Sequence, residues 1–324
     1  MKKTLFCVIA IISMVSVNAK VWRVNNTPGV NADFTTFNQA QNGAKVGDTL
    51  MFEGSNTYYG NEKDTLRKPL TIIGPGYFIN DNYSENDNIL PAKLDNLYID
   101  TLASNSVVMG MHINGSCYVS GSNIIIERNY ANNIYLGKEN TIQNVVIAKN
   151  FIDYLLATST NYDISASTNI IITNNIIDYE LRLNSHSTAI ITNNCINRLE
   201  KVSNSTIKNN TIGYLFYYNE YCNIDYNLFG YDLPENGVGN VYHEDFSTGV
   251  FITGENLSLD GAYQLSSNSV AKGIGENGVD CGAFGSSTPY VLSGFPPIPV
   301  VTNVVMPTTV TNELSIQIQA KAQE

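Results

Sequence analysis

The chain has 324 residues, and its 18 Lys and Arg residues against 29 Asp and Glu residues give a formal net charge of −11. Nucleic acids and anionic membrane surfaces repel a protein of this charge, so we expect neither as a partner.

Residues 1–19 are predicted to be a signal peptide. The basic residues Lys2 and Lys3 precede an apolar stretch that ends in the small-residue sequence Val17-Asn-Ala, which is typical of a cleavage site. The stretch is too short to span a bilayer as a stable helix, and no later stretch is apolar enough to do so. We therefore expect no transmembrane segment and a secreted, periplasmic or cell-surface location, with an uncleaved anchor as the alternative.

The mature chain opens with elements that differ from the rest of the chain. After an extended segment at residues 21–24, Asp33 is placed to cap a short helix from Phe34 to Ala44, whose apolar residues fall on one face. Two short strands come next, at residues 50–53 and 70–73. A lone helix before a series of strands suits a cap over the open end of a β-stack, where unpaired strand edges need cover.

A short motif recurs six times between residues 123 and 230. Each copy is an apolar run followed by two mostly polar residues and an Asn, and the recurring Asn positions are Asn129, Asn150, Asn175, Asn194, Asn210 and Asn227. Some steps between them are too short for an amphipathic helix, whereas three short strands with turns fit. This favours an all-β fold, a right-handed parallel β-helix, which is a single-stranded solenoid whose neighbouring turns are hydrogen-bonded to each other.

Within this register the columns have separate roles. We expect the recurring Asn to form a structural ladder of amides, and to adopt the left-handed backbone of a tight corner. The residue three places earlier is always Ile, so that column should fill the core. The β-helix domain, including its cap, is expected to span residues 20–293.

Another column points outward although it is mostly apolar: Ile125, Val146, Ile171, Ile190 and Thr206. An apolar stripe of this length needs cover from the chain itself or from a partner, including a second copy. Residues 294–324 are a Pro-rich connector and a strand segment that we expect to pack on the stack. Four cysteines, Cys117, Cys195, Cys222 and Cys281, match no zinc spacing, and we favour buried free thiols over disulfides.

The flanking sequences resemble a known superfamily. Phe34-Thr-Thr-Phe, Gly47-Asp-Thr-Leu and Leu70-Thr-Ile-Ile-Gly near the start, and Gly278-Val-Asp-Cys-Gly-Ala-Phe-Gly near the end, are similar to secreted pectin-lyase-like β-helix proteins. The ending from Pro289 to Pro299 resembles a Bacteroidetes group of such proteins, mostly without assigned activity. This resemblance implies the fold but only a broad choice of functions, since the fold hosts lyases, hydrolases, adhesins and structural proteins.

Candidate catalytic groups are sparse, and no catalytic residue is assigned. Arg128 and Lys149 share a position on adjacent turns and suggest a clamp for a uronic acid, although solvated corner residues are the favoured interpretation. Asp153 and Asp178 also share a column, which we interpret as a structural turn. His243-Glu-Asp is the one local cluster of His with acids, and a surface loop is favoured there over a metal site. We predict no metal and no cofactor.

The candidate binding surface is a column four places after the Asn: Tyr154, Tyr179, Arg198, Tyr214 and Tyr231. Aromatic rings at this spacing can stack on successive sugar rings, or on one another. The sequence therefore predicts a β-helix protein that binds, and on one interpretation processes, a polysaccharide. A non-catalytic adhesin or envelope structural protein is the alternative and a polysaccharide lyase a further one, so enzymatic activity stays open.

Overall fold

The computed structural model describes residues 19–82, 89–137, 140–157, 167–215, 221–305 and 317–321. The predicted signal peptide lies outside these residues except for Ala19.

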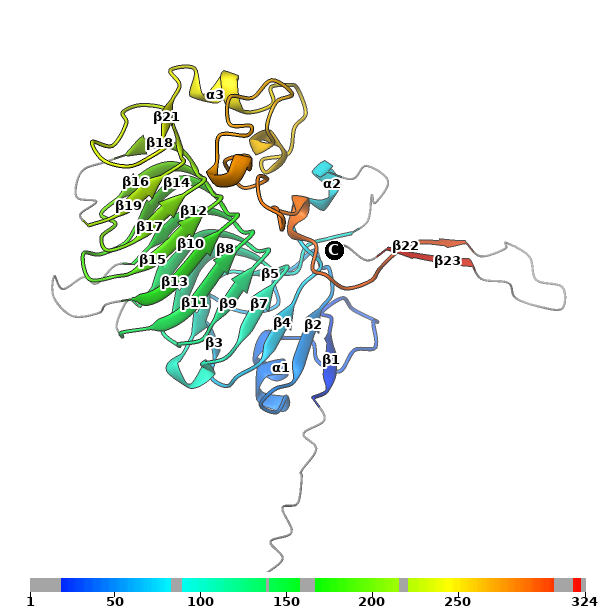
Figure 1. Ribbon diagram of the computed structural model, residues 1–324. Helices are drawn as coiled ribbons and strands as arrows, with labels where there is room; N and C mark the ends of the chain where they lie inside the picture. The colour runs from blue at the N-terminus through cyan, green and yellow to red at the C-terminus, as the bar shows by residue number, and fades with distance from the viewer. Residues whose placement is uncertain are drawn as a thin grey trace, which may run out of the picture.

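Two long parallel sheets run side by side along the molecule (Figure 1). In the first sheet the described strands are, in spatial order, β1 (Val21–Val24), β2 (Thr49–Phe52), β4 (Thr71–Ile73), β7 (Val107–Met109), β9 (Ile125–Glu127), β11 (Gln143–Ala148), β13 (Thr168–Thr173), β15 (Ala189–Thr192), β17 (Thr206–Lys208) and β19 (Asn223–Asp225). In the second they are β3 (Asp64–Leu66), β6 (Leu97–Ile99), β8 (His112–Val119), β10 (Tyr130–Leu136), β12 (Phe151–Leu156), β14 (Ile176–Arg182), β16 (Cys195–Glu200), β18 (Thr211–Leu215), β20 (Leu228–Phe229) and β21 (Val241–Tyr242), with β5 (Lys93–Leu94) also paired to β8.

From β6 to β20 the described chain alternates between the two sheets, and we call each turn of the chain through both sheets a rung. Successive rungs pair in parallel, as β11 does with β9 on one side and β13 on the other. This arrangement confirms the predicted right-handed parallel β-helix.

The predicted core columns are buried. The Ile column, Ile126 to Ile224, is at most 7% exposed in every copy, and Ile124, Val145 and Ile170 of the neighbouring inward column are fully buried. Their strand registers align rung by rung, so the sequence periodicity translates directly into a continuous apolar interior.

The Asn ladder is confirmed and is longer than the six predicted positions. Each Asn side-chain Nδ2 donates to the Oδ1 of the Asn on the next rung at 2.9–3.2 Å, from Asn129 through Asn227, and Asn240 accepts the last of these bonds. The ladder ends on the other side at Met111, whose backbone N–H donates to Asn129 Oδ1. The first six members are fully buried, so these amides satisfy one another and the backbone inside the protein.

The left-handed corner residue differs from the prediction. The ladder Asn itself does not have a positive φ; the residue just before it does, and the set is Arg128, Lys149, Asn174, Asn193, Asn209 and Tyr226, with φ of 54° to 57°. The ladder Asn instead has its amide turned into the stack. The Asn that opens the motif (Asn123, Asn144, Asn169, Asn204) does adopt the left-handed conformation.

A short helix covers the N-terminal end of the stack. Helix α1 (Phe37–Gly43) buries Phe37 and Ala40 against the core, as expected of a cap. Its N-cap is Thr36, whose hydroxyl accepts from Gln39 N–H, and the predicted cap Asp33 accepts from Arg23 N–H instead. The other described helices are α2 (Ile79–Asn82) and α3 (Phe246–Val250), with 3-10 turns at Thr101–Ala103, Gly261–Tyr263, Glu276–Gly278 and Leu292–Gly294.

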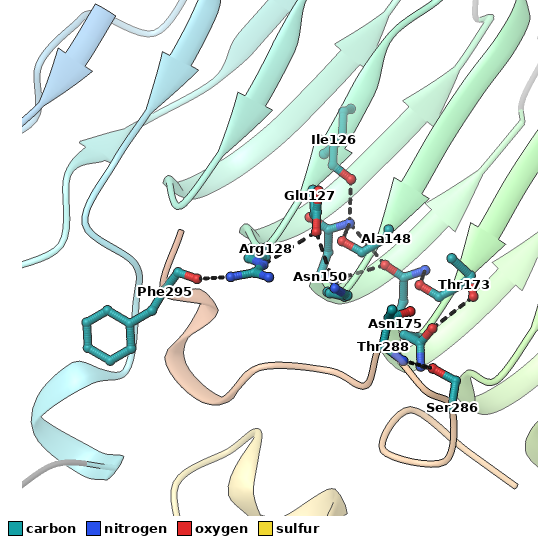
Figure 2. A network of polar contacts seen from close by, with 12 residues as sticks. Ile126, Glu127, Arg128, Ala148, Asn150, Thr173, Asn175, Ser286, Thr288 and Phe295 are labelled. Carbon is teal, nitrogen blue, oxygen red and sulfur yellow. Dashed lines mark hydrogen bonds and ion pairs between the residues drawn. The ribbon is translucent and has the colours of Figure 1, made fainter. Parts of the chain in front are cut away.

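A covering segment, residues 246–299, packs across the ladder corner on the outside of the stack. Its Ala283 and Tyr290 form a second buried apolar cluster with Phe151, Ile176 and Cys195 of the second sheet. Figure 2 shows Arg128 at this corner reaching Phe295 of the segment. The sequence did not predict this cover.

The strands predicted beyond the connector are present as β22 (Val300–Val305) and β23 (Gln317–Lys321). They pair with each other in antiparallel fashion and join neither sheet of the stack. In Figure 1 this hairpin projects away from the sheets. It therefore does not provide the cover of the outer apolar stripe that the sequence had led us to expect. Self-pairing gives the backbone groups that face the partner strand their hydrogen bonds without a stack edge.

The four cysteines among the described residues are free thiols, as predicted. Cys117, Cys195 and Cys281 are buried and Cys222 is half-buried. Burial raises the pKa of Cys117 and of Cys281 to about 12, and that of Cys195 to about 11. These thiols are therefore protonated and protected in the folded protein.

Candidate functional site

The predicted tyrosine and arginine column lies on the outer face of the second sheet. Tyr154 comes from β12, Tyr179 from β14, Arg198 from β16 and Tyr214 from β18, and Tyr231 follows β20. Side-chain accessibility agrees with an outward position, since Tyr179, Tyr214 and Tyr231 are 51%, 48% and 62% exposed.

The column is less regular than the sequence suggests, because β14 carries one extra residue. The backbone partner of Tyr154 is Glu180 and not Tyr179, and the register continues from Glu180 to Arg198 and Tyr214. Tyr179 therefore sits in a β-bulge, which re-aims its side chain.

The rings form two pairs with a hollow between them. Tyr154 and Tyr179 stack almost parallel, with centroids 5.2 Å apart and an interplanar angle of 6°. Tyr214 and Tyr231 are 5.6 Å apart and tilted by 39°. Between Tyr179 and Tyr214 lies a groove of about 330 Å³, which we call the tyrosine groove; its lining residues are Tyr154, Tyr179, Glu180, Asn197, Arg198 and Tyr214.

The spacing of the groove follows from the strand order. Tyr179 and Tyr214 are on strands separated by β16, so their backbones lie two rungs, or roughly 9.6 Å, apart. Asn197 and Arg198 come from the intervening strand and supply polar groups to the same space. The groove therefore combines apolar walls with hydrogen-bonding groups, as ligand sites do.

Charged side chains beside the groove are paired. Arg198 Nη2 lies 2.6 Å from Glu200 Oε2, and Arg182 Nε lies 3.3 Å from Glu180 Oε1. In the register Glu180 is opposite Arg198, and Arg182 is opposite Glu200. These four residues form a square of alternating charge on β14 and β16, which we call the charge square.

A second tyrosine stack on the same sheet was missed by the sequence reasoning. Tyr98, Tyr118 and Tyr135 lie on successive rungs β6, β8 and β10, with centroids 4.5 and 5.1 Å apart. In the register Tyr135 is followed by Leu156, Arg182 and Glu200, so the stack continues into one edge of the charge square. Counting from the ladder position does not align them, since Tyr135 lies six places after Asn129 and Tyr118 seven after Met111, with a register shift between β10 and β8.

A larger hollow of about 730 Å³ lies near the start of this stack. It is lined by Tyr58, Gly60, Asn61, Glu62, Lys63 and Asp95. The Lys63 ammonium lies 5.3 Å from the Tyr98 ring centroid, which connects this hollow to the second stack.

The two aspartates interpreted as a turn lie inside the second sheet. Asp153 is in β12 and Asp178 in β14, at the point where the register shifts, and both are half-buried. The Tyr263 hydroxyl, from the covering segment, donates to Asp178 Oδ1. Burial, and after it the nearby Asp178 carboxylate, raise the pKa of Asp153 to about 6. The pair is therefore a structural bend closed by Tyr263, next to the tyrosine groove, and not a turn.

The candidate clamp for a uronic acid is not formed. Arg128 is 3% exposed, and its Nη1 donates to Phe295 O at 2.6 Å beneath the covering segment, so it is neither a solvated corner residue nor a ligand-binding group. Lys149 and Arg128 both lie within 4 Å of Glu127, at 3.6 and 3.4 Å. Figure 2 shows Arg128 held between Glu127 and Phe295.

The His243 cluster lies just before α3, where Glu244 and Asp245 are exposed. Among the residues that the structure describes, no group of three or more His, Cys, Asp or Glu side chains is arranged to hold a metal ion. No helix in the described part of the chain is long and apolar enough to cross a membrane.

The fold and this outer face define the class of protein: a parallel β-helix with an aromatic groove on one sheet. No family model matches the chain, and neither does any curated protein or solved structure.

Proposed function

We propose that this protein is a secreted or cell-surface β-helix protein that binds a polysaccharide through the tyrosine groove. The observation that carries the proposal is the groove of about 330 Å³ between Tyr179 and Tyr214, with Asn197 and Arg198 contributed by the strand between them. Sugar rings have apolar faces and hydroxyl edges, so they need aromatic walls and polar groups together.

The stacked pair Tyr154 and Tyr179 has a different role within this proposal. Because the two rings are nearly parallel and in contact, each covers one face of the other. Tyr154 therefore supports Tyr179 and fixes its ring, and the side of Tyr179 toward β16 faces the groove. Positioning of this kind lowers the entropy lost when a ligand binds.

Replacing Tyr179 or Tyr214 with alanine is expected to weaken binding to the recognised polysaccharide about tenfold each, because a wall of the groove is lost. A glycan array followed by affinity electrophoresis on the best-bound polymer measures this. Tyr221→Ala is the matched control, since Tyr221 is 85% exposed and does not line the groove. Unchanged binding by both groove variants would remove the proposed surface.

A second candidate is a non-catalytic adhesin or envelope structural protein that associates with itself through the outer apolar stripe. Ile125 and Ile190 are 37% and 47% exposed on the first sheet, and β22 and β23 do not pair with that sheet. An exposed row of this kind is typical of an interaction surface.

On this second candidate, Ile190→Lys is expected to convert an assembled species to a monomer in light scattering coupled to gel filtration, because a charge would be buried in the contact. Leu102→Lys is the control, since Leu102 is an apolar residue that is 69% exposed and lies outside the stripe. A wild type that is monomeric at all concentrations rules out this candidate.

A further inference from the structure

The charges around the tyrosine groove restrict which polysaccharides can enter it. Three cations lie on β14, on β16 and directly after β16: Arg182, Arg198 and Lys201. Each lies within 4 Å of a carboxylate on the same face, at 3.3 Å for Arg182, 2.6 Å for Arg198 and 3.8 Å for Lys201.

The carboxylates of this face are also more numerous than the cations. Glu180 and Glu200 complete the charge square, and Asp153 and Asp178 lie on the same strands as Tyr154 and Tyr179. Four carboxylates against three cations leave a local charge of −1, within a chain whose formal net charge is −11. A polymer with one carboxylate on each sugar would meet no uncompensated positive charge here, and would be repelled by the protein as a whole.

The same groups are well suited to hydroxyls. The side chains of Arg182 and Arg198 are 34% and 41% exposed, whereas those of Glu180 and Glu200 are only 14% exposed. Each arginine lies within 4 Å of its carboxylate, which restricts the direction of its N–H donors. A fixed donor between aromatic walls matches the hydroxyl edge of an uncharged sugar ring.

We infer that the tyrosine groove takes an uncharged polysaccharide and excludes polyuronates. This inference rests on the proposed function and adds the substrate class to it. The alternating charges of the square supply hydrogen bonds to hydroxyl groups, and their near-zero sum removes the attraction that a uronate-binding site requires.

The test compares two groups of polymers under two salt conditions. The neutral group is a β-glucan, a galactomannan and an arabinoxylan, and the acidic group is polygalacturonate and alginate. We expect the wild type to bind at least one neutral polymer with an affinity that changes less than about twofold between roughly 50 and 500 mM NaCl, because no ion pair with the ligand is made. Binding to either acidic polymer should be at least about tenfold weaker.

A double variant, Glu180→Gln/Glu200→Gln, raises the local charge from −1 to +1 and leaves both arginines without their carboxylates. It is expected to gain binding to polygalacturonate that disappears at high salt. Asp81→Asn/Glu255→Gln changes the net charge equally at two exposed residues outside the groove and is the matched control. Thermal melting verifies that each variant is folded.

The possible results separate the two proposals. If the wild type binds polygalacturonate or alginate as tightly as any neutral polymer, and does so in a salt-dependent way, the inference about substrate class is wrong and the proposed function stands. If Tyr179→Ala and Tyr214→Ala leave all polymer binding unchanged, or nothing binds, both are wrong. Salt-independent binding to neutral polymers, lost in the tyrosine variants, supports both.

Discussion

Replacing Asn175 with alanine is expected to lower the free energy of unfolding by about 3 to 5 kcal/mol. Asn175 is fully buried in the middle of the ladder. Its Oδ1 accepts from Asn150 N–H at 2.9 Å and from Asn150 Nδ2 at 3.0 Å. Alanine leaves the Asn150 backbone N–H buried without this acceptor, and an orphaned buried donor costs about 1 to 3 kcal/mol by itself.

The donor side of Asn175 adds to this loss. Its Nδ2 donates to Ile147 O at 2.8 Å, to Thr173 O at 3.1 Å and to Asn194 Oδ1 at 3.0 Å. Bonds in such a chain of amides polarise one another, so the loss of one member weakens its neighbours as well. Chemical denaturation measures the total, and amide hydrogen exchange at Asn150 measures the local loss of protection.

Asn169→Gly is the matched control for the ladder variant. Asn169 lies on the same rung and is exposed, it has a φ of 55° that glycine adopts without strain, and its side-chain Nδ2 donates to Asn144 Oδ1 at 2.5 Å. We expect the free energy of unfolding of the Asn169→Gly protein to stay within about 1 kcal/mol of that of the wild type. Water can replace the exposed Asn169 amide as a hydrogen-bond partner. An Asn175→Ala protein as stable as this control would show that the ladder does not hold the stack.

Much of the stack was predictable because its residues recur at intervals that strand geometry explains. A side chain that is Ile in all six copies has to be core, and a buried amide that recurs on every rung has to find its partners in the copies above and below. Burial at these positions depends only on the place of each residue within the repeat, and the spacing of the sequence contains that information.

The features that were missed depend on single insertions or on distant parts of the chain. Counting from the ladder Asn aligned Tyr154 with Tyr179, but the bulge in β14 places Glu180 opposite Tyr154. A bulge of one residue is not visible when the apolar pattern resumes after it. The glycine at position 213 is also explained by a local contact. A Cβ there would lie 2.6 Å from Asn197 O, so a larger residue does not fit.

Arg128 and Lys149 illustrate the effect of distant contacts. The two residues occupy equivalent corner positions with almost the same φ, and nothing in the repeat distinguishes them. Arg128 is buried because Phe295, 167 residues away in the chain, accepts its hydrogen bond. The covering segment contains no sequence repeat, so the repeat register could not predict its contacts with the stack.

Removal of the Asp260 carboxylate is expected to detach this covering segment from the stack. Asp260 is fully buried and joins three parts of the protein: Oδ1 accepts from Asn82 Nδ2 at 2.9 Å, and Oδ2 accepts from Ser293 N–H at 2.7 Å and from the Tyr290 hydroxyl at 3.2 Å. Tyr290 in turn is hydrogen-bonded to Tyr77 at 2.6 Å between the two hydroxyls. Asp260→Ala leaves the Ser293 N–H buried without this acceptor and removes one acceptor each from Asn82 and Tyr290, at a cost of about 3 to 5 kcal/mol.

The cysteines report whether this loss is local. Cys195 lies under the covering segment, where its Sγ accepts from Ala283 N–H at 3.3 Å, whereas Cys117 lies in the interior of the stack. In folded Asp260→Ala we expect a maleimide to label Cys195 while Cys117 stays protected, because the ladder and core are untouched. Mass spectrometry of peptides from the labelled protein distinguishes the two sites.

Asp280→Ala provides the comparison within the same segment. Asp280 Oδ1 accepts from Gly273 N–H at 2.9 Å in a half-exposed position, so its loss is expected to cost about 1 kcal/mol and to leave Cys195 unlabelled. If Asp260→Ala also leaves Cys195 protected, the segment is held by its apolar contacts with Phe151 and Ile176, and the buried carboxylate is not what fixes it to the stack. Labelling of Cys195 and Cys117 together would instead mean that the segment and the solenoid unfold as one cooperative unit, since a repeat stack is stabilised mainly by contacts between neighbouring rungs.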